Sequence, residues 1–223
     1  MPGPFAAFKW AAVLRDWPIF AQGFGMTIIL SALALMLALA LGIFFGVLGA
    51  AKGKKSRLCN RIYVEFIQNT PLVIQIFFLY HGLPHLGVML PVFTVGVLGV
   101  GVYHGAYVAE AIRAGIQAVP RGQLEAAVSQ GLSYWGAMRH VVLPQAKRIA
   151  LPALTNQAVS LIKNTSVLAM VAGGDLMYHA DSWASNNLYY GPAYIVTGLL
   201  YLAICMPLAG YARRLERKLE VSL

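Results

Sequence analysis

Three long stretches without charge constrain this chain more than any other feature of its sequence. No Asp, Glu, Lys or Arg occurs at 17–51, 66–109 or 182–212. A helix that crosses a bilayer needs roughly 20 mainly apolar residues, so each stretch has room for a span and the middle one has room for two. The chain is 59% hydrophobic and 11% charged, whereas a soluble domain averages about 25% charged residues. The sequence therefore predicts an all-α membrane protein.

The apolar segments predict five transmembrane helices in a single transmembrane domain over residues 22–212. Their expected ranges are about 22–51, 62–81, 92–112, 144–171 and 190–211. Residues 1–21 predict an N-terminal interfacial segment, because their aromatic side chains approach one face of a helix that is expected to end near Pro18. Residues 213–223 form a polar tail.

The basic residues predict how the chain is oriented. The formal net charge of +9 is concentrated in three clusters beside the apolar runs: Lys52, Lys54, Lys55, Arg57 and Arg61; Arg113, Arg121, Arg139, Lys147 and Arg148; and Arg213, Arg214, Arg217 and Lys218. Cytoplasmic loops carry an excess of Lys and Arg, and five spans place all three clusters on one side if the N-terminus is outside. The sequence thus predicts a cytoplasmic C-terminus and contacts with anionic lipid, and not with nucleic acid.

Two apparent cofactor motifs fail on closer inspection. Gly53 to Ser56 suggests a phosphate-binding loop, but Leu48 stands where the first glycine is required and Lys55 where Ser or Thr is required. His81 and His85 have the spacing of one helix face, but Gly82 and Pro84 are expected to break a helix between them. We therefore expect no ATP site, no metal site and no catalytic residues in this chain.

The segment 120–144 carries the clearest functional pattern. Residues 124–130 favour a helix, Gly131 permits a turn, and Ser133 is positioned to cap a second short helix that begins at Tyr134. Two short helices at an angle make a rigid corner, which can sit in a cleft of another protein and transmit its movement. The long basic loop at 114–144 is therefore predicted to dock a partner.

This segment resembles the cytoplasmic signature of permease subunits of ATP-binding-cassette importers, the EAA loop. The matching positions are Glu125, Ala126, Ala127, Gly131, Leu143 and Pro144. The departure is Val141, where the signature has Ile. The resemblance implies the type I importer transmembrane fold, with a coupling helix docked on a separate ATPase subunit that holds ATP-Mg. Glu125 would meet a basic group of that ATPase, and Ala126 and Ala127 would permit close approach.

Further stretches at 67–84, 107–123 and 160–171 resemble the polar amino-acid branch of this family, with Ala114-Gly115 where branch members often have two glycines. The resemblance covers about residues 20–220. It implies a bacterial inner-membrane complex of two permease subunits, alike or related, two ATPases and an extracytoplasmic amino-acid-binding protein.

Polar residues within the predicted spans are candidates for the substrate pathway, because such groups are costly in a bilayer. They are Asn69, Thr70 and Gln75 in the second span and Lys163, Asn164, Thr165 and Ser166 in the fourth. Lys163 or the hydroxyl groups would hold an α-carboxylate, and the amide oxygens would accept from an ammonium group. Hydrogen bonding between helices explains the Asn/Thr/Ser cluster equally well. For Gln68 and Asn69, near the cytoplasmic end, hydrogen bonding between helices or a gate is the favoured explanation.

The acidic residues bear on the substrate. Glu65 and Glu110 lie near cytoplasmic span ends, and Glu110 is spaced to pair with Arg113. No carboxylate falls clearly at mid-membrane, which favours acidic or neutral polar amino acids over cationic ones. An ABC permease for another small solute, such as an opine, is an alternative function. A secondary transporter that needs no ATP is the rival mechanism; it would be expected to have paired repeats and a midplane carboxylate.

Overall fold

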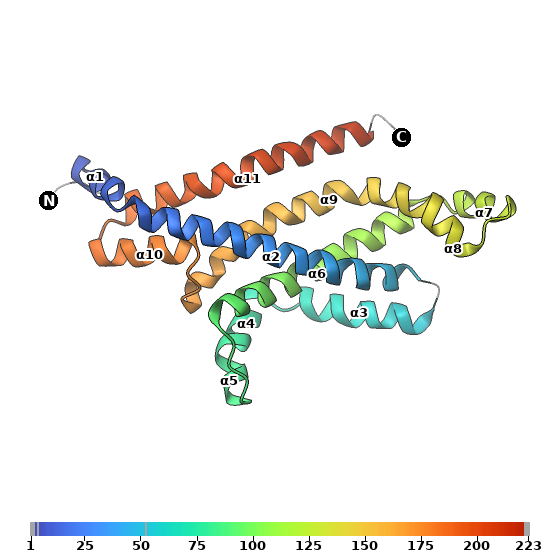
Figure 1. The fold of residues 1–223 in the computed structure, drawn as a ribbon, viewed down its shortest axis with the longest axis horizontal. Helices are drawn as coiled ribbons and strands as arrows, with labels where there is room; N and C mark the ends of the chain where they lie inside the picture. Colours follow the sequence, from blue (N-terminus) through green and yellow to red (C-terminus); the bar gives the residue numbers. More distant parts are fainter. Residues whose placement is uncertain (1–2, 4, 52, 221–223) are drawn as a thin grey trace. The chain divides into compact units, whose positions relative to one another are not determined.

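The computed structural model describes residues 3, 5–51 and 53–220, and the side chains of these residues except 218–220. Lys52, the side chain of Lys218, residues 1, 2 and 4 of the N-terminal segment and residues 221–223 of the tail lie outside the described residues. Every regular element in the described ranges is helical (Figure 1): α1 (Ala7–Arg15), α2 (Trp17–Ala50), α3 (Lys54–Gln68), α4 (Leu72–Phe77), α5 (Leu83–His85), α6 (Val92–Ala118), α7 (Arg121–Ser129), α8 (Tyr134–Ala137), α9 (Leu143–Asn164), α10 (Leu176–Asn187) and α11 (Tyr190–Glu220).

Three of these helices are long and apolar enough to cross a membrane: Trp17–Ala50, Val92–Ala118 and Tyr190–Arg217. A fourth is added if the bent pair Lys54–Gln68 and Leu72–His85 counts as one span. The predicted span at 144–171 corresponds to α9 followed by a 3-10 helix over Thr165–Val171. The all-helical membrane class is confirmed, and the count of five spans stays a prediction.

The helix predicted over 62–81 is interrupted in the structure. α3 begins earlier, at Lys54, and ends at Gln68, and α4 begins only after Pro71. Proline disfavours helical backbone in the residue before it and has no N–H to donate. The side chains of Asn69 and Thr70 satisfy the end of α3 by donating to the carbonyl oxygens of Glu65 (2.7 Å) and Phe66 (2.9 Å).

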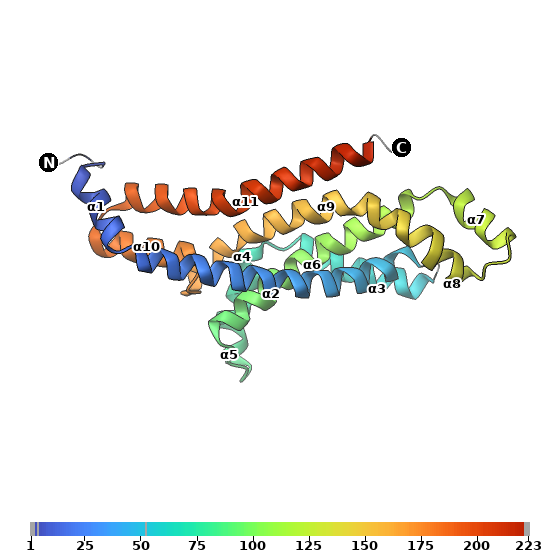
Figure 2. The same cartoon turned by 45° about the horizontal axis from the view of Figure 1, so that its top comes forward.

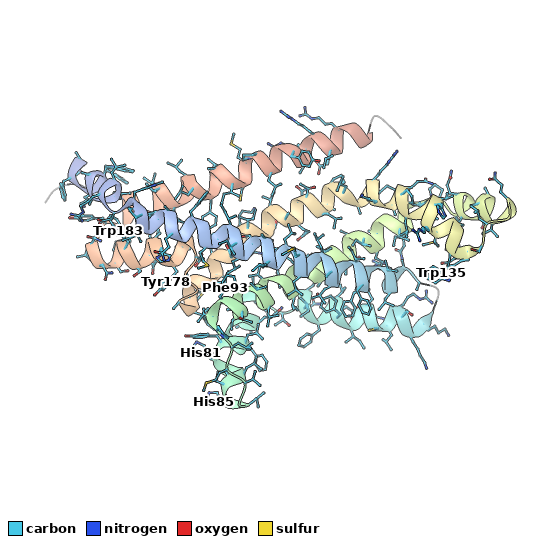
Figure 3. All side chains as sticks on the ribbon, viewed as in Figure 1. His81, His85, Phe93, Trp135, Tyr178 and Trp183 are labelled. Atoms are coloured by element: carbon cyan, nitrogen blue, oxygen red, sulfur yellow. The ribbon has the colours of Figure 1, made fainter. Side chains whose placement is uncertain are left out.

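The predicted N-terminal helix does end near Pro18, and two other prolines, Pro18 and Pro84, lie in the first turns of the helices that follow. α1 ends at Arg15, and Pro18 lies in the first turn of α2, where a missing N–H costs little because no helical partner exists for it. Pro84 lies in the first turn of α5, directly after a π-helical turn over Phe78–Gly82. The expected break between His81 and His85 is therefore wrong (Figure 3).

The chain divides into two compact units, and each combines segments distant in sequence. The first unit holds Met1–Leu37, Pro71–Gly101 and Val159–Leu208, and the second holds Ala38–Thr70, Val102–Ala158 and Ala209–Leu223.

In the first unit, α10 packs beside α1 and the start of α2 (Figures 1 and 2). Phe20 and Trp183 are buried and meet edge to face, with ring centroids 5.4 Å apart. The Trp183 Nε1–H donates to Asp16 at 2.9 Å, and Arg15 also donates to this carboxylate. The hydrogen bond from Arg15 and, to a smaller extent, the one from Trp183 lower the pKa of Asp16 to about 2.

The sequence did not predict α10, which lies in an expected loop. Asp175 caps it: its carboxylate accepts from the backbone N–H groups of Met177 (3.1 Å) and Tyr178 (3.3 Å). Asp175 is fully buried, which raises the pKa of its carboxyl, and it also accepts from the Tyr201 hydroxyl at 3.2 Å. The buried Thr27 hydroxyl accepts from the backbone N–H of Leu176 at 2.9 Å. These bonds tie the start of α10 to α2 and α11.

In the second unit, α2 and α6 approach each other closely at the glycines that the sequence spaces four residues apart. A Cβ added to Gly46 would lie 2.7 Å from the carbonyl oxygen of Ala109 and 2.9 Å from the Cβ of Ile112. α3 is fixed to the same pair of helices, because Asn60 donates to the Phe45 carbonyl (2.9 Å) and the Tyr63 hydroxyl donates to the Val102 carbonyl (2.8 Å). Small residues at helix interfaces permit such approach in membranes.

We expect Gly46→Ala to destabilise the second unit. The added methyl group would collide with the Ala109 carbonyl oxygen, which belongs to the backbone of α6 and moves only if the helix moves. Overpacking of this kind costs about 1–3 kcal/mol. Gly25→Ala, in the same helix, is the matched control, since a Cβ there meets nothing within 4 Å and alanine is the better helix former. Thermal unfolding in detergent should show a lower Tm for Gly46→Ala only. Equal Tm values for the two variants would contradict the close packing.

Candidate functional site

The EAA-like segment is built on a small apolar core of its own. Val119, Val142 and Ala146 are buried together. Ile116, Leu124 and Met138 pack against them. This core joins the end of α6 to α7 and to the start of α9. The segment between α6 and α9 is thus anchored at both ends and at its middle.

The turn between the two short helices has the hydrogen bonds of a Schellman motif. Gly131 has φ +91°, its N–H donates to the Val128 carbonyl (2.9 Å), and the Leu132 N–H donates to the Ala127 carbonyl (3.2 Å). These bonds satisfy carbonyl groups that the end of α7 would otherwise leave without partners. The predicted turn at Gly131 is confirmed, and so is the reason for a glycine there.

The second short helix also begins as predicted. The Ser133 hydroxyl accepts from the Gly136 N–H at 3.1 Å, which caps α8. A π-helical turn over Met138–Val142 then leads directly into α9. Leu143 and Pro144 form the first turn of α9 and are exposed.

The signature residues of α7 point in different directions. Glu125 and Ala126 are exposed, whereas Ala127 is only 5% exposed and faces the chain's own core. Trp135 of α8 is 75% exposed near the tip of the loop (Figure 3). Glu125, Ala126 and Trp135 are therefore exposed on these two short helices, whereas Ala127 packs within the chain.

The polar candidates of the predicted fourth span lie together where α9 gives way to the 3-10 helix. Lys163 is exposed, and Asn164 is half-buried. Thr165 is fully buried and donates to the Ile162 carbonyl (2.7 Å), and Ser166 donates to the Lys163 carbonyl (2.7 Å). Of this group, Lys163 presents its polar atoms most openly.

The candidates of the predicted second span are divided between the two units. Gln75 lies in α4, which packs against the 3-10 helix Thr165–Val171 of the first unit. Asn69 and Thr70 belong to the second unit, where their side chains cap α3. The structure therefore packs the helix that carries Gln75 against the 3-10 helix that carries Thr165 and Ser166, and it places Asn69 and Thr70 in the other unit.

Polar contacts that the sequence analysis did not identify occur in the second unit. His104 is 2% exposed, and its Nδ1 lies 3.2 Å from Oε1 of Gln157, which joins α6 to α9. A histidine in an otherwise apolar run, opposite a glutamine in the next span, was the available indication. The predicted local ion pair between Glu110 and Arg113 is confirmed. Within the described ranges, no three His, Cys, Asp or Glu side chains come together as metal ligands.

The sequence of this chain matches a known protein family. Residues 38–221 match the family described as binding-protein-dependent transport system inner membrane component.

Individual relatives match over almost their whole length. The chain is 42% identical over 207 residues to the probable glutamine ABC transporter permease protein GlnM of Bacillus subtilis (strain 168), covering 93% of this chain and 96% of that protein. It is 31% identical over 216 residues to the glutamine transport system permease protein GlnP of Escherichia coli (strain K12), covering 96% and 99%.

Solved structures share the fold. A crystal structure of an amino acid ABC transporter with histidines superimposes with a TM-score of 0.87 at 34% sequence identity, and the match covers 94% of this chain and 98% of that one. An inward-facing structure of the MetNI methionine ABC transporter gives a TM-score of 0.73 at 16% identity, which shows likeness of fold alone.

We expect Gly131→Ala to loosen the turn between α7 and α8, because an L side chain at positive φ costs about 1–2 kcal/mol. Hydrogen exchange at the amides of residues 131 and 132 should then become roughly 5- to 30-fold faster. Gly122→Ala is the control, since Gly122 lies inside α7, has ordinary φ and has open space around it. Unchanged exchange in Gly131→Ala would show that the Schellman bonds do not hold the turn.

Proposed function

We propose an import function for this chain, which belongs to the family of binding-protein-dependent transport system inner membrane components. It is a multi-pass component of the inner membrane and a transport subunit. We propose that it is the permease of an ATP-binding-cassette importer for amino acids, as the names of its relatives suggest, with the N-terminus outside and the C-terminus in the cytoplasm.

The exposed corner formed by α7 and α8 supports docking of an ATPase subunit. Its shape is fixed by three independent features: the Schellman turn at Gly131, the Ser133 cap and the core around Val142. A corner held in this way transmits a push from a partner to α6 and α9. Glu125 adds a negative charge that a basic group on the ATPase can meet.

The partners follow from this role. We propose that two copies of the ATPase bind ATP-Mg and close on each other, which moves the corners of two permease subunits. A second permease, identical or related, completes the pathway, and an extracytoplasmic binding protein delivers the amino acid. This chain itself supplies no catalytic group in the proposed cycle.

We expect Glu125→Lys to reduce recovery of an ATPase subunit at least tenfold when the tagged chain is purified from native membranes in mild detergent. The reversed charge would repel the basic group in the ATPase groove. Gln130→Lys is the control, because Gln130 is exposed at the end of α7 but is not one of the matching signature positions. Equal recovery from both variants, or none from the wild type, would contradict the docking proposal.

The charges of the first unit support a neutral polar or acidic amino acid as substrate. Its three acidic residues are all engaged: Asp16 by Arg15 and Trp183, Asp175 by the start of α10, and Asp181 by the Tyr194 hydroxyl. Each carboxylate in the described part of this unit thus already accepts a hydrogen bond from within the chain, and none of them forms an ion pair with Lys163. Lys163 is available for an α-carboxylate or an acidic side chain.

We expect uptake of labelled L-glutamine to fall when excess L-glutamate or unlabelled L-glutamine is added, and to be unaffected by L-arginine or L-lysine. The physical reason is that a cationic side chain would meet Lys163 without a compensating carboxylate. Competition assays on intact cells measure this order directly. Arginine or lysine as the strongest competitor would overturn the substrate class and leave the permease role standing.

A further inference from the structure

The second unit contains a cavity that the proposed coupling and substrate-pathway residues do not use. Its volume is about 510 Å³, within the range of sites that hold small ligands. It opens between the end of α2, α3 and α6, beside the basic clusters. We call it the vestibule; its charged and amide lining residues include Arg57, Arg61, Glu65, Glu110, Arg113 and Gln117.

The charges of the vestibule are mixed, with one guanidinium in excess. Arg61 pairs with Glu65 (2.7 Å), and Arg113 pairs with Glu110. Arg57 also lines the wall and is exposed, and no carboxylate among the described residues lies within ion-pair distance of it. Three guanidinium groups against two carboxylates leave the lining with one net positive charge.

This pattern fits a zwitterion better than a simple anion. A guanidinium binds a carboxylate through two parallel hydrogen bonds, and Arg57 has this capacity unused. A carboxylate that already pairs with arginine still has lone pairs for an ammonium group, so Glu65 and Glu110 can accept from one. A phosphate group has no ammonium group to donate to these two carboxylates, so it would use only the Arg57 side of the vestibule.

The vestibule is also continuous with the coupling segment. An adjacent cavity of about 500 Å³ shares Gly49, Arg57 and Gln117 with it and extends to Glu125 and Tyr134. Arg57 therefore lines both cavities. A ligand held by Arg57 would lie next to the segment that we propose to move with the ATPase.

From this arrangement we infer that the vestibule binds the α-carboxylate and α-ammonium groups of an amino acid as it leaves toward the cytoplasm. Arg57 takes the carboxylate, and Glu65 and Glu110 take the ammonium. The side chain extends into the adjacent cavity, whose Leu124 and Met138 are apolar. The inference rests on the proposed import function and adds to it a low-affinity exit site distinct from the Lys163 region.

The test is equilibrium binding of labelled L-glutamine to the whole complex in nanodiscs, without binding protein, for the wild type, Arg57→Gln, Arg57→Lys and Lys54→Gln. We expect Arg57→Gln to weaken binding about tenfold or more, the loss expected for one charge-assisted pair. Arg57→Lys should restore part of it, because the charge returns without the paired geometry. Lys54→Gln is the control: Lys54 is an exposed base on the same helix and lines neither cavity.

Competition by two further compounds tests which chemical class of ligand the vestibule binds. L-glutamine amide, which lacks the carboxylate charge, should compete poorly, and inorganic phosphate should not compete. Binding that is equal in Arg57→Gln and wild type, or that phosphate displaces, overturns the inference. ATP-driven uptake is measured on the same complexes in proteoliposomes, with the binding protein supplied outside. If it is intact while L-glutamine fails to bind, the vestibule inference fails alone; if uptake needs no ATP, the proposed function fails and the inference with it.

Discussion

Gly42 and Gly46 bring α2 into backbone contact with α6, and the second unit is organised around that contact. α3 folds back along the pair and is held by hydrogen bonds from Asn60 and Tyr63 to main-chain carbonyls. This geometry fixes the wall that carries Arg57 and Arg61 opposite the wall that carries Glu110 and Arg113. A side chain at the glycine positions would separate the two walls and change both cavities.

In the first unit, the buried carboxylate of Asp175 is surrounded by hydrogen-bond donors. In an apolar solvent an unpaired polar group costs several kcal/mol, so Asp175 is surrounded by donors from its own helix start and from Tyr201. The cost explains why a buried acid in a transporter need not be a substrate group. It also directs attention to Lys163, the exposed cation of that unit's polar segment, as the group with spare capacity.

Much of the fold was predictable because lipid as solvent leaves few options. Charge-free runs must become helices, and the cap at Ser133 and the turn at Gly131 follow from local chemistry alone. The misses have local causes as well. Pro84 predicts a break in the helix, although proline is equally suited to the first turn of a helix.

Other features depended on tertiary contacts. α10 has a local cap in Asp175, but the bond from Leu176 to Thr27 that ties its start to α2 joins residues far apart in the sequence. The inward orientation of Ala127 and the joint lining of one cavity by Arg57 and Glu110 needed three dimensions. Spacing along the chain does not specify which face of a helix meets another. The sequence pattern of the coupling segment therefore does not predict that Ala127 faces inward.

In the proposed function, this permease moves amino acids with energy from a separate ATPase. The most direct measurement is uptake of labelled L-glutamine by proteoliposomes that contain the purified complex, with its binding protein supplied outside. Accumulation against a gradient that requires ATP inside the vesicles, and that persists when ion gradients are dissipated, is the predicted result. Accumulation that ignores ATP and collapses with the ion gradient would contradict the account and establish a secondary transporter.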